Sequence, residues 1–218
     1  MPALFADLSI AGIPLAFLSI ALIVELTPGP NMAYLAALAL AEGRRAGFAT
    51  VIGIAAGLLV VGVLAALGVA TFVSESRSLY AALRWAGMLY MLWLSYDIWR
   101  GEDHRETEFV AENKSRTTYV GRGFLTNVLN PKAAVFFIAV LPQFIDPEHD
   151  TAQQTLKLSI VYAAIATLIH AAIVVLASHA RPFFQDAARM TILRRVLAAG
   201  LVIVAFWLFW STAENRPA

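Results

Sequence analysis

The sequence of 218 residues contains no cysteine and little charge, and both shortages narrow what the protein can be. Without cysteine the chain forms no disulfide, no thiolate metal site and no thiol redox centre. Only 14% of its residues are charged, whereas soluble domains carry about 25%. The formal net charge of +1 provides no strongly basic surface, so we expect no nucleic-acid partner.

Hydrophobic residues make up 60% of the chain, against about 45–50% in soluble domains even when glycine is counted. A soluble fold of this size cannot bury so much apolar surface, but a lipid bilayer accommodates it. The first 30 residues contain no lysine or arginine, so they lack the charged start of a cleaved signal peptide. We expect them to hold the first membrane span and to be retained in the mature protein.

About 20 apolar residues cross the hydrocarbon of a bilayer as a helix. The uncharged piece after Glu25 and the pieces on either side of Lys132 are too short to span alone, so we merge the stretches across these two residues. The sequence then predicts an all-α integral membrane protein with a single transmembrane domain over residues 1–218. Its six predicted spans lie near residues 14–38, 47–73, 79–99, 122–144, 156–179 and 192–211.

Lysine and arginine are distributed unevenly between the two sets of connections. The loops after the first, third and fifth spans hold eleven of them with their helix edges, and the other side of the membrane holds four. Because short cytoplasmic loops are enriched in these residues, the sequence predicts that both termini lie outside. The polar linker 101–120 in the middle of the chain is then cytoplasmic.

The chain also shows signs of an internal duplication. Leu26-Thr27-Pro28 in the first span recurs as Leu129-Asn130-Pro131 in the fourth, which suggests repeats over residues 8–100 and 121–213. Three spans per repeat is an odd number, so the second copy is predicted to be inverted, with a broken first helix in each. Broken helices at matching positions of inverted repeats indicate a transport site at the membrane midplane.

Each break has a local chemical explanation. Thr27 and Asn130 are suitable N-caps, and proline suits the first position of a helix, so a new half-helix is expected to start at each pair. The prolines should also leave the carbonyls of Val24, Leu26 and Asn127 without helical partners. Such half-helix ends can bind the carboxylate and the ammonium of a zwitterion. The alternative is that the prolines only kink packed helices.

Two formal charges flank the breaks, and charges inside a membrane usually face a cavity or a partner. Glu25 and Lys132 are therefore candidates for substrate binding or proton coupling, although a purely structural ion pair between them is the alternative. His170 in the fifth span is either a proton relay or a hydrogen-bonded packing residue. Asp97 lies among aromatic residues, which favours an interfacial anchor over the alternative of a proton site.

Other polar and small residues fit supporting roles. Gly53 and Gly57 form a small-residue face on the second span, which predicts close helix packing. Of the neutral polar residues in the fourth span, Asn127 lies one turn before the break and is a better cavity candidate than Gln143.

These motifs resemble the LysE/RhtB family of amino-acid exporters over essentially the whole chain. The resembling segments are 27–31 (Thr-Pro-Gly-Pro-Asn), 42–47 (Glu-Gly-Arg-Arg-Ala-Gly), 123–133 (Gly-Phe-Leu-Thr-Asn-Val-Leu-Asn-Pro-Lys-Ala) and 141–144 (Leu-Pro-Gln-Phe). The resemblance implies a six-span carrier of the bacterial cytoplasmic membrane that exports amino acids or their derivatives, coupled to the proton gradient. It does not specify the substrate, and Glu25 stands where an apolar residue would be expected.

Together these arguments predict a secondary transporter whose partners are an amino-acid substrate, protons and the lipid bilayer, with no cofactor and no metal. The sequence leaves open whether the protein forms a homo-oligomer. The coupling candidates are Glu25, Lys132 and His170. The predicted substrate-binding residues are Thr27, Pro28, Gly29, Pro30, Asn31, Asn127, Asn130, Pro131 and Lys132.

Two other classes of protein are alternatives to a carrier. An intramembrane enzyme would need a nucleophile with its base or a set of metal ligands, and the sequence has no HExxH or GxSxG motif. A channel or a non-transporting scaffold would have no obvious use for two matching helix breaks.

Overall fold

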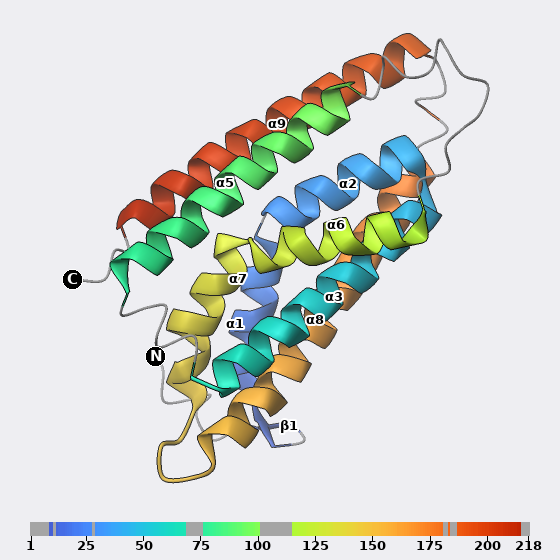
Figure 1. Cartoon of the computed structure of the whole chain (residues 1–218). Helices are drawn as coiled ribbons and strands as arrows, with labels where there is room; N and C mark the ends of the chain where they lie inside the picture. Colours follow the sequence, from blue (N-terminus) through green and yellow to red (C-terminus); the bar gives the residue numbers. More distant parts are fainter. Residues whose placement is uncertain are drawn as a thin grey trace.

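The computed structural model describes residues 9–10, 12–27, 29–68, 76–100, 115–180, 183 and 187–214. Helices dominate this part of the chain, as predicted (Figure 1). Within it, the only strands are the two-residue pair β1 (Ser9–Ile10) and β2 (Ile13–Pro14), which run antiparallel just before the first helix. Most of the predicted linker 101–120 lies outside the described residues.

The first predicted span is broken into α1 (Leu15–Leu26) and α2 (Pro30–Glu42), which are bent by 52°. Thr27 (φ −66°, ψ 124°) and Gly29 (φ −154°, ψ 179°) between them are extended. Each of these residues precedes a proline, and a residue before proline is sterically disfavoured from the α region. Two prolines in close succession therefore hold the chain open between the half-helices, although Pro28 itself lies outside the described residues.

The fourth predicted span is broken in the same manner. Helix α6 (Arg116–Val128) is followed by α7 (Pro131–Val135), which continues through the π-helical turn η1 (Phe136–Val140) and the 3-10 turn η2 (Leu141–Phe144). The segments before and after the break are bent by 49°. Both predicted helix breaks are thus present.

Four further helices complete the described part, and their bounds are α3 (Arg44–Ala66), α5 (Arg77–Arg100), α8 (Thr151–Ala180) and α9 (Ala187–Glu214). By length and hydropathy α3 and α8 qualify as membrane spans, and each bent pair also qualifies if it is taken as one span. The described residues therefore contain two to four candidate spans rather than six. Helices α5 and α9 carry four charged residues each, against two in α3 and one in α8.

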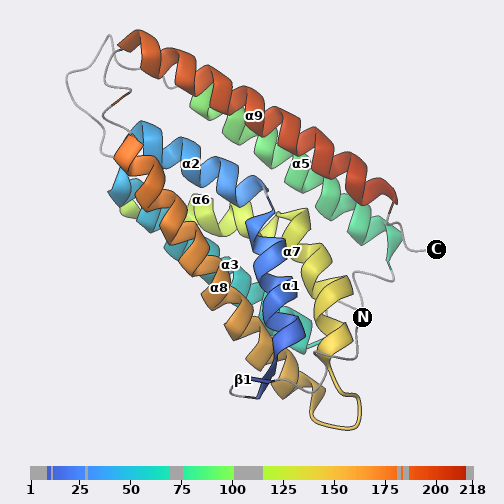
Figure 2. The ribbon, with the colours of Figure 1, turned by 180° about the vertical axis from the view of Figure 1, so that it is seen from behind.

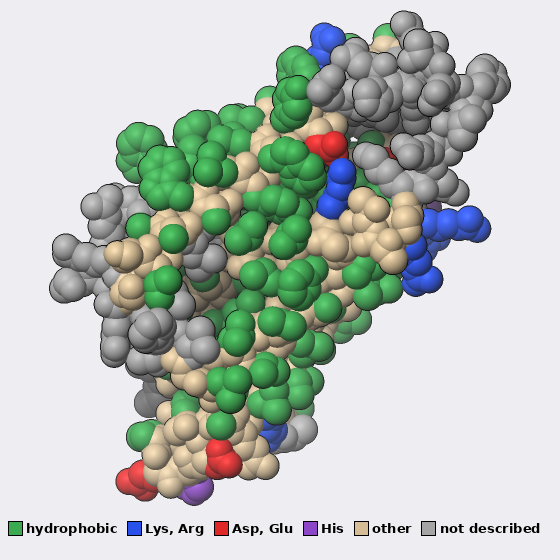
Figure 3. All heavy atoms as spheres, in the orientation of Figure 1, with side chains coloured by type: hydrophobic (Ala, Val, Ile, Leu, Met, Phe, Trp, Pro, Cys, Tyr) green, Lys and Arg blue, Asp and Glu red, His purple; other side chains and the backbone are tan. Residues whose placement is uncertain are grey.

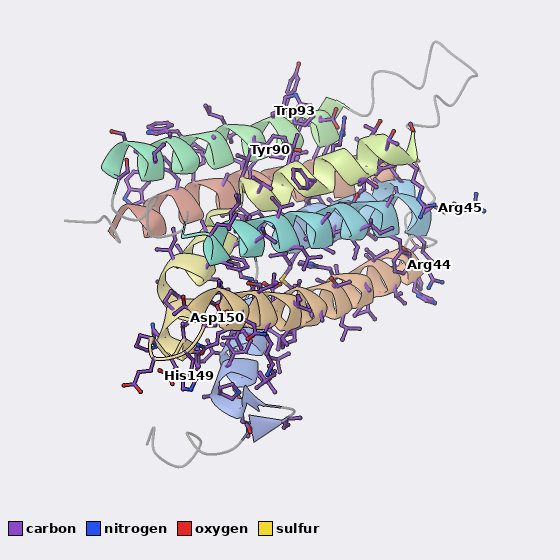
Figure 4. All side chains as sticks on the ribbon, turned by 60° about the horizontal axis from the view of Figure 1, so that its bottom comes forward. Arg44, Arg45, Tyr90, Trp93, His149 and Asp150 are labelled. Carbon is purple, nitrogen blue, oxygen red and sulfur yellow. The ribbon has the colours of Figure 1, made fainter. Side chains whose placement is uncertain are left out.

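The helices form a main bundle and an attached pair (Figures 1 and 2). Helix α3 packs against α6 and α8 in the bundle, and α5 packs along α9 in the pair, which reaches the bundle mainly through α2. Arg44 and Arg45 lie at one end of the molecule, and His149 and Asp150 lie at the opposite end (Figure 4). Helices α1 and α6 approach the middle of the bundle from opposite ends.

Glycines allow α3 and α6 to approach closely. A Cβ atom on Gly53 would lie 2.0 Å from the carbonyl oxygen of Val120, and one on Gly123 would lie 2.2 Å from that of Thr50. A Cβ atom on Gly57 would lie 3.0 Å from the Cβ of Asn127. The prediction that Gly53 and Gly57 serve close packing is confirmed, since small residues let membrane helices bring their backbones together.

The outer surface of the bundle is apolar. Hydrophobic side chains are spread over the middle of the face shown in Figure 3. Among the described residues, large ones such as Leu168 on α8 and Trp210 on α9 are more than 70% exposed. Soluble monomers rarely expose apolar patches beyond a few hundred square ångströms. This surface is therefore the expected lipid contact of a membrane protein.

Candidate functional site

The two helix breaks meet at one cavity in the middle of the bundle. It contains about 250 Å³ of empty space, including its opening, and its centre has room for about one water molecule. Seven of its lining residues were predicted site residues, namely Glu25, Gly29, Asn31, Asn127, Asn130, Lys132 and His170. The others are Met32, Leu58, Ala133 and Tyr162. A ligand of amino-acid size can enter only if some of these side chains move.

The first break is capped differently from the prediction. The hydroxyl of Thr27 donates to the carbonyl of Ile23 in the preceding turn at 2.9 Å, and the N-cap of α2 is Gly29. The prediction that Thr27 caps the second half-helix is therefore wrong. The reason is that Pro30 occupies the first helical position, so the helix begins two residues later than expected.

The second break follows the prediction. The side-chain oxygen of Asn130 accepts a 3.0 Å hydrogen bond from the backbone N–H of Lys132, and Pro131 occupies the first turn of α7. Asn130 is thus confirmed as an N-cap. It is only 4% exposed, so this polar contact is enclosed in the bundle.

Two carbonyls that were predicted to lack partners have them. The N–H of Thr27 donates to the carbonyl of Val24 at 3.2 Å, and the N–H of Asn130 donates to that of Asn127 at 3.0 Å. These bonds span three residues rather than four, which is a common way of closing the last turn of a helix. The prediction was wrong for these two carbonyls because it considered only the regular α-helical partner.

Lys132 connects the two breaks. Its Nζ donates a 2.8 Å hydrogen bond to the backbone carbonyl of Thr27 at the end of α1. A Cβ atom on Gly29 would lie only 3.1 Å from Cδ of Lys132, so the missing side chain of Gly29 makes room for the lysine. The ammonium group therefore lies between the end of α1 and the start of α7.

Glu25 is buried, at 5% exposure, and faces α8 rather than Lys132. Its Oε1 accepts a hydrogen bond from the hydroxyl of Tyr162, and its Oε2 lies 3.6 Å from Nε2 of His170. The ion pairs of the described residues do not include one between Glu25 and Lys132. The alternative that Glu25 and Lys132 form a structural ion pair is therefore not what the structure shows.

His170 is 1% exposed, and in the described part of the chain neither of its ring nitrogens has a hydrogen-bond partner. The alternative that it is a hydrogen-bonded packing residue is therefore not what the structure shows. An unsatisfied buried polar group costs about 1–3 kcal/mol. A histidine left in this state beside a carboxylate is a functional candidate.

A pair of asparagines lies beside Lys132. The side-chain amide of Asn31 donates to the side-chain oxygen of Asn127 at 3.0 Å. The remaining amide atoms, Oδ1 of Asn31 and Nδ2 of Asn127, are buried and have no protein partner among the described residues. One free acceptor and one free donor are thus available at the cavity.

Asp97 lies outside this cavity. Its carboxylate pairs with the guanidinium of Arg122 on α6, which also lies 5.1 Å above the ring of Trp93. The backbone carbonyl of Arg122 accepts a 3.2 Å hydrogen bond from the hydroxyl of Tyr90 (Figure 4). Asp97 therefore fixes α5 to α6 by a direct ion pair, which is a more specific role than the interfacial anchor that was predicted.

Tyr162 is a cavity residue that sequence reasoning missed. A single tyrosine in an apolar helix usually indicates packing or an interface, and nothing near it in the sequence suggests a partner. One signal was available, because Tyr162 and His170 are eight residues apart and so lie close to the same face of a helix. Both residues on that face contact Glu25.

The family profile described as "LysE type translocator" matches residues 22–212. The chain belongs to this family. The family segment includes both helix breaks and every residue that lines the cavity, so the site lies within the shared fold. No solved structure matches this LysE-type chain.

Curated relatives cover most of the chain. An uncharacterized membrane protein of Vibrio cholerae serotype O1 is 30% identical over 71% of this chain and 76% of its own. The homoserine/homoserine lactone efflux protein of Salmonella typhi is 26% identical over 87% of this chain and 92% of its own. The leucine efflux protein of Klebsiella pneumoniae subsp. pneumoniae is 29% identical over 63% of this chain and 65% of its own.

Proposed function

We propose that this LysE-family protein is a secondary transporter that exports an amino acid or an amino-acid derivative across the bacterial cytoplasmic membrane, driven by proton entry. The observation that carries the proposal is the cavity at the two helix breaks, where Lys132 supplies a cation and Glu25 an anion. Because these charges do not pair with each other, both can serve a zwitterionic ligand.

The lining of the cavity suggests how such a substrate binds. The substrate carboxylate accepts from Nζ of Lys132 and from the free Nδ2 of Asn127. The substrate ammonium donates to the free Oδ1 of Asn31 and lies toward Glu25. Only the donor is charged in the bond from Lys132 to the Thr27 carbonyl, whereas both partners are charged in a bond from Lys132 to the substrate carboxylate. The substrate therefore replaces the hydrogen bond between Lys132 and the Thr27 carbonyl with a stronger one.

The size and polarity of the rest of the site favour an uncharged side chain. Met32, Leu58 and Ala133 supply the apolar part of the lining. The names of the relatives refer to efflux of homoserine, homoserine lactone and leucine, and none of these molecules has a charged side chain. We therefore expect a neutral amino acid rather than a basic or acidic one.

The arrangement of the helices supports alternating access by two inverted three-span repeats. Helix α1 approaches the cavity from the end that holds His149, and α6 approaches it from the end that holds Arg44. Helix α3 packs on α6 as α8 packs on α1, while α5 packs on α9. Six spans and both termini outside complete this proposal, and rocking of one repeat against the other would expose the site to each side in turn.

The proposal is tested by flux in proteoliposomes loaded with L-leucine or L-homoserine. We expect efflux that saturates with substrate and increases when the outside is acidic. Lys132→Met should abolish it, because the substrate carboxylate loses its cation. Lys157→Met is the matched control, since Nζ of Lys157 also donates to a backbone carbonyl, that of Gly12 at 3.1 Å, but lies outside the cavity. Flux that does not saturate indicates a channel, and absence of flux for a wider amino-acid panel contradicts a transporter.

A further inference from the structure

Glu25 is the more deeply buried of the two formal charges in the cavity. Its carboxylate has a hydrogen bond from Tyr162 on α8 and lies 3.6 Å from His170, about two turns further along the same helix. The fourth titratable group that lines the cavity is Lys132 on α7. The cavity residues from α2 and α3 are uncharged, so α8 and α7 supply the groups that face Glu25.

A carboxylate buried inside a membrane protein needs a partner of opposite charge or a proton. Lys132 is not that partner in this structure, because its Nζ is bonded to the Thr27 carbonyl. His170 is within 3.6 Å, but its nitrogens form no hydrogen bond in the part of the chain that is described. Among the described residues, the Glu25 carboxylate thus has one neutral hydrogen-bond donor, and its second oxygen faces His170.

We propose that the Glu25 carboxylate is the coupling group of the transporter, because it binds either a proton or the substrate ammonium but not both. This inference rests on the proposed function and deepens it. Lys132 binds the substrate carboxylate and takes no part in proton transfer. Tyr162 is a positioning residue that holds the carboxylate toward the cavity.

The exchange balances without any further reactant. When the site faces outward, the substrate leaves, and a proton from the outer water forms an O–H bond with Oε2 of Glu25. When the site faces inward, that bond breaks, the proton passes to the cytoplasmic water by way of Nε2 of His170, and the freed carboxylate receives the ammonium of a new substrate. One proton enters for each substrate that leaves, because both ligands require the same oxygen atoms.

The packing of Tyr162 makes its hydroxyl a fixed donor. Its ring is stacked on that of Phe136 at 3.7 Å between centroids, and the ring of Phe137 lies edge-on at 5.9 Å. The hydroxyl therefore cannot follow Glu25 if the carboxylate moves. Loss of this donor should make the charged carboxylate less favourable while the ring and the shape of the cavity stay the same.

Proton binding is measured on the full-length purified protein without substrate, by infrared titration from about pH 5 to about pH 9. We expect the band of a protonated buried carboxyl group in the wild type and its loss in Glu25→Gln. Tyr162→Phe should alter this titration, because the charged carboxylate loses a hydrogen-bond donor. Tyr34→Phe is the matched control, because Tyr34 is as buried as Tyr162 but lies in a different core cluster. A titration that Glu25→Gln leaves intact overturns the proposal.

Sharing of the carboxylate is measured separately, with whichever of L-leucine and L-homoserine shows saturable flux. Addition of that amino acid to unbuffered wild-type protein at low pH should release one proton per molecule bound, and Glu25→Gln should release none. Binding without release overturns the exchange even though the transporter itself stands. If no amino acid of the wider panel is transported, the proposed function fails on its own, and the infrared titration still decides whether Glu25 is the proton site.

Discussion

The side-chain amide of Asn31, just after the first helix break, donates a 3.0 Å hydrogen bond to the side-chain oxygen of Asn127, just before the second. The two residues are 96 positions apart in the sequence and lie on α2 and α6. Both are almost completely buried. The bond joins the two halves of the chain at the cavity itself, so it should contribute to stability and to the shape of the site.

A double-mutant cycle with Asn31→Leu and Asn127→Leu measures this connection. Each single substitution leaves one buried amide without a partner, so the double mutant should lose less stability than the sum of the two. Hydrogen bonds between membrane helices give coupling energies of about 0.6–1.7 kcal/mol, and unfolding in detergent should yield a value in that range. Gln143→Leu is the control, because its amide bonds within its own helix, to the carbonyl of Ala139. Coupling of Asn127 to Gln143 as large as to Asn31 would contradict the assignment.

Two glycines of α6 should respond oppositely to alanine. A Cβ atom on Gly123 would lie 2.2 Å from the carbonyl of Thr50, whereas one on Gly121 would have nothing within 4 Å. Gly121→Ala should hold or raise the melting temperature, because alanine is favoured over glycine in a helix by about 0.8–1 kcal/mol. Gly123→Ala should lower the melting temperature by forcing α3 away from α6. Equal melting temperatures for the two variants would mean that this helix contact is looser than described.

Replacement of Pro131 by alanine should let α6 and α7 join into one continuous helix. Because proline costs about 3 kcal/mol in a regular helix, the variant is expected to be at least as stable as the wild type. Export should nevertheless be lost, since the continuous helix displaces the Asn130 cap and Lys132 from the cavity. Pro142→Ala at the start of η2 lies beyond the cavity residues and should retain flux. Full transport by a stable Pro131→Ala protein would show that the break is only a kink.

Orientation can be checked by single cysteines, because the chain has none of its own. Arg45 and Asp150 are exposed at opposite ends of the molecule (Figure 4). An impermeant thiol reagent added to intact cells should label Asp150→Cys, while Arg45→Cys should be labelled only after the membrane is opened. The reverse pattern would overturn the predicted orientation of the termini.

The positions of the helix breaks could be predicted from the sequence because proline acts locally. Pro30 and Pro131 start new helices for reasons contained in a few neighbouring residues, and Asn130 caps its helix as its position predicts. Thr27 was misassigned because two prolines lie close together, and the sequence does not show which of them takes the first helical position. The break was thus located correctly, but the start of the second half-helix was placed two residues too early.

The partners of the charged groups could not be predicted, because they depend on tertiary contacts. Glu25 and Lys132 lie at equivalent distances from the breaks and carry opposite charges, so an ion pair was a reasonable alternative. In the structure, Gly29 leaves space for Lys132 to reach the Thr27 carbonyl, and α8 brings Tyr162 to Glu25 instead. Each of these contacts joins segments more than 100 residues apart, and no local pattern encodes them.

The hydrogen bond between Lys132 and the Thr27 carbonyl affects which solutes can use the proton gradient of the cell. It spans the gap between α1 and α7, at a cavity with room for about one water molecule. A solute without a carboxylate offers the ammonium group no better acceptor than the carbonyl that it already has, so such a solute does not loosen the gap. On the proposed mechanism, solutes without a carboxylate are therefore not exported at the expense of the proton gradient.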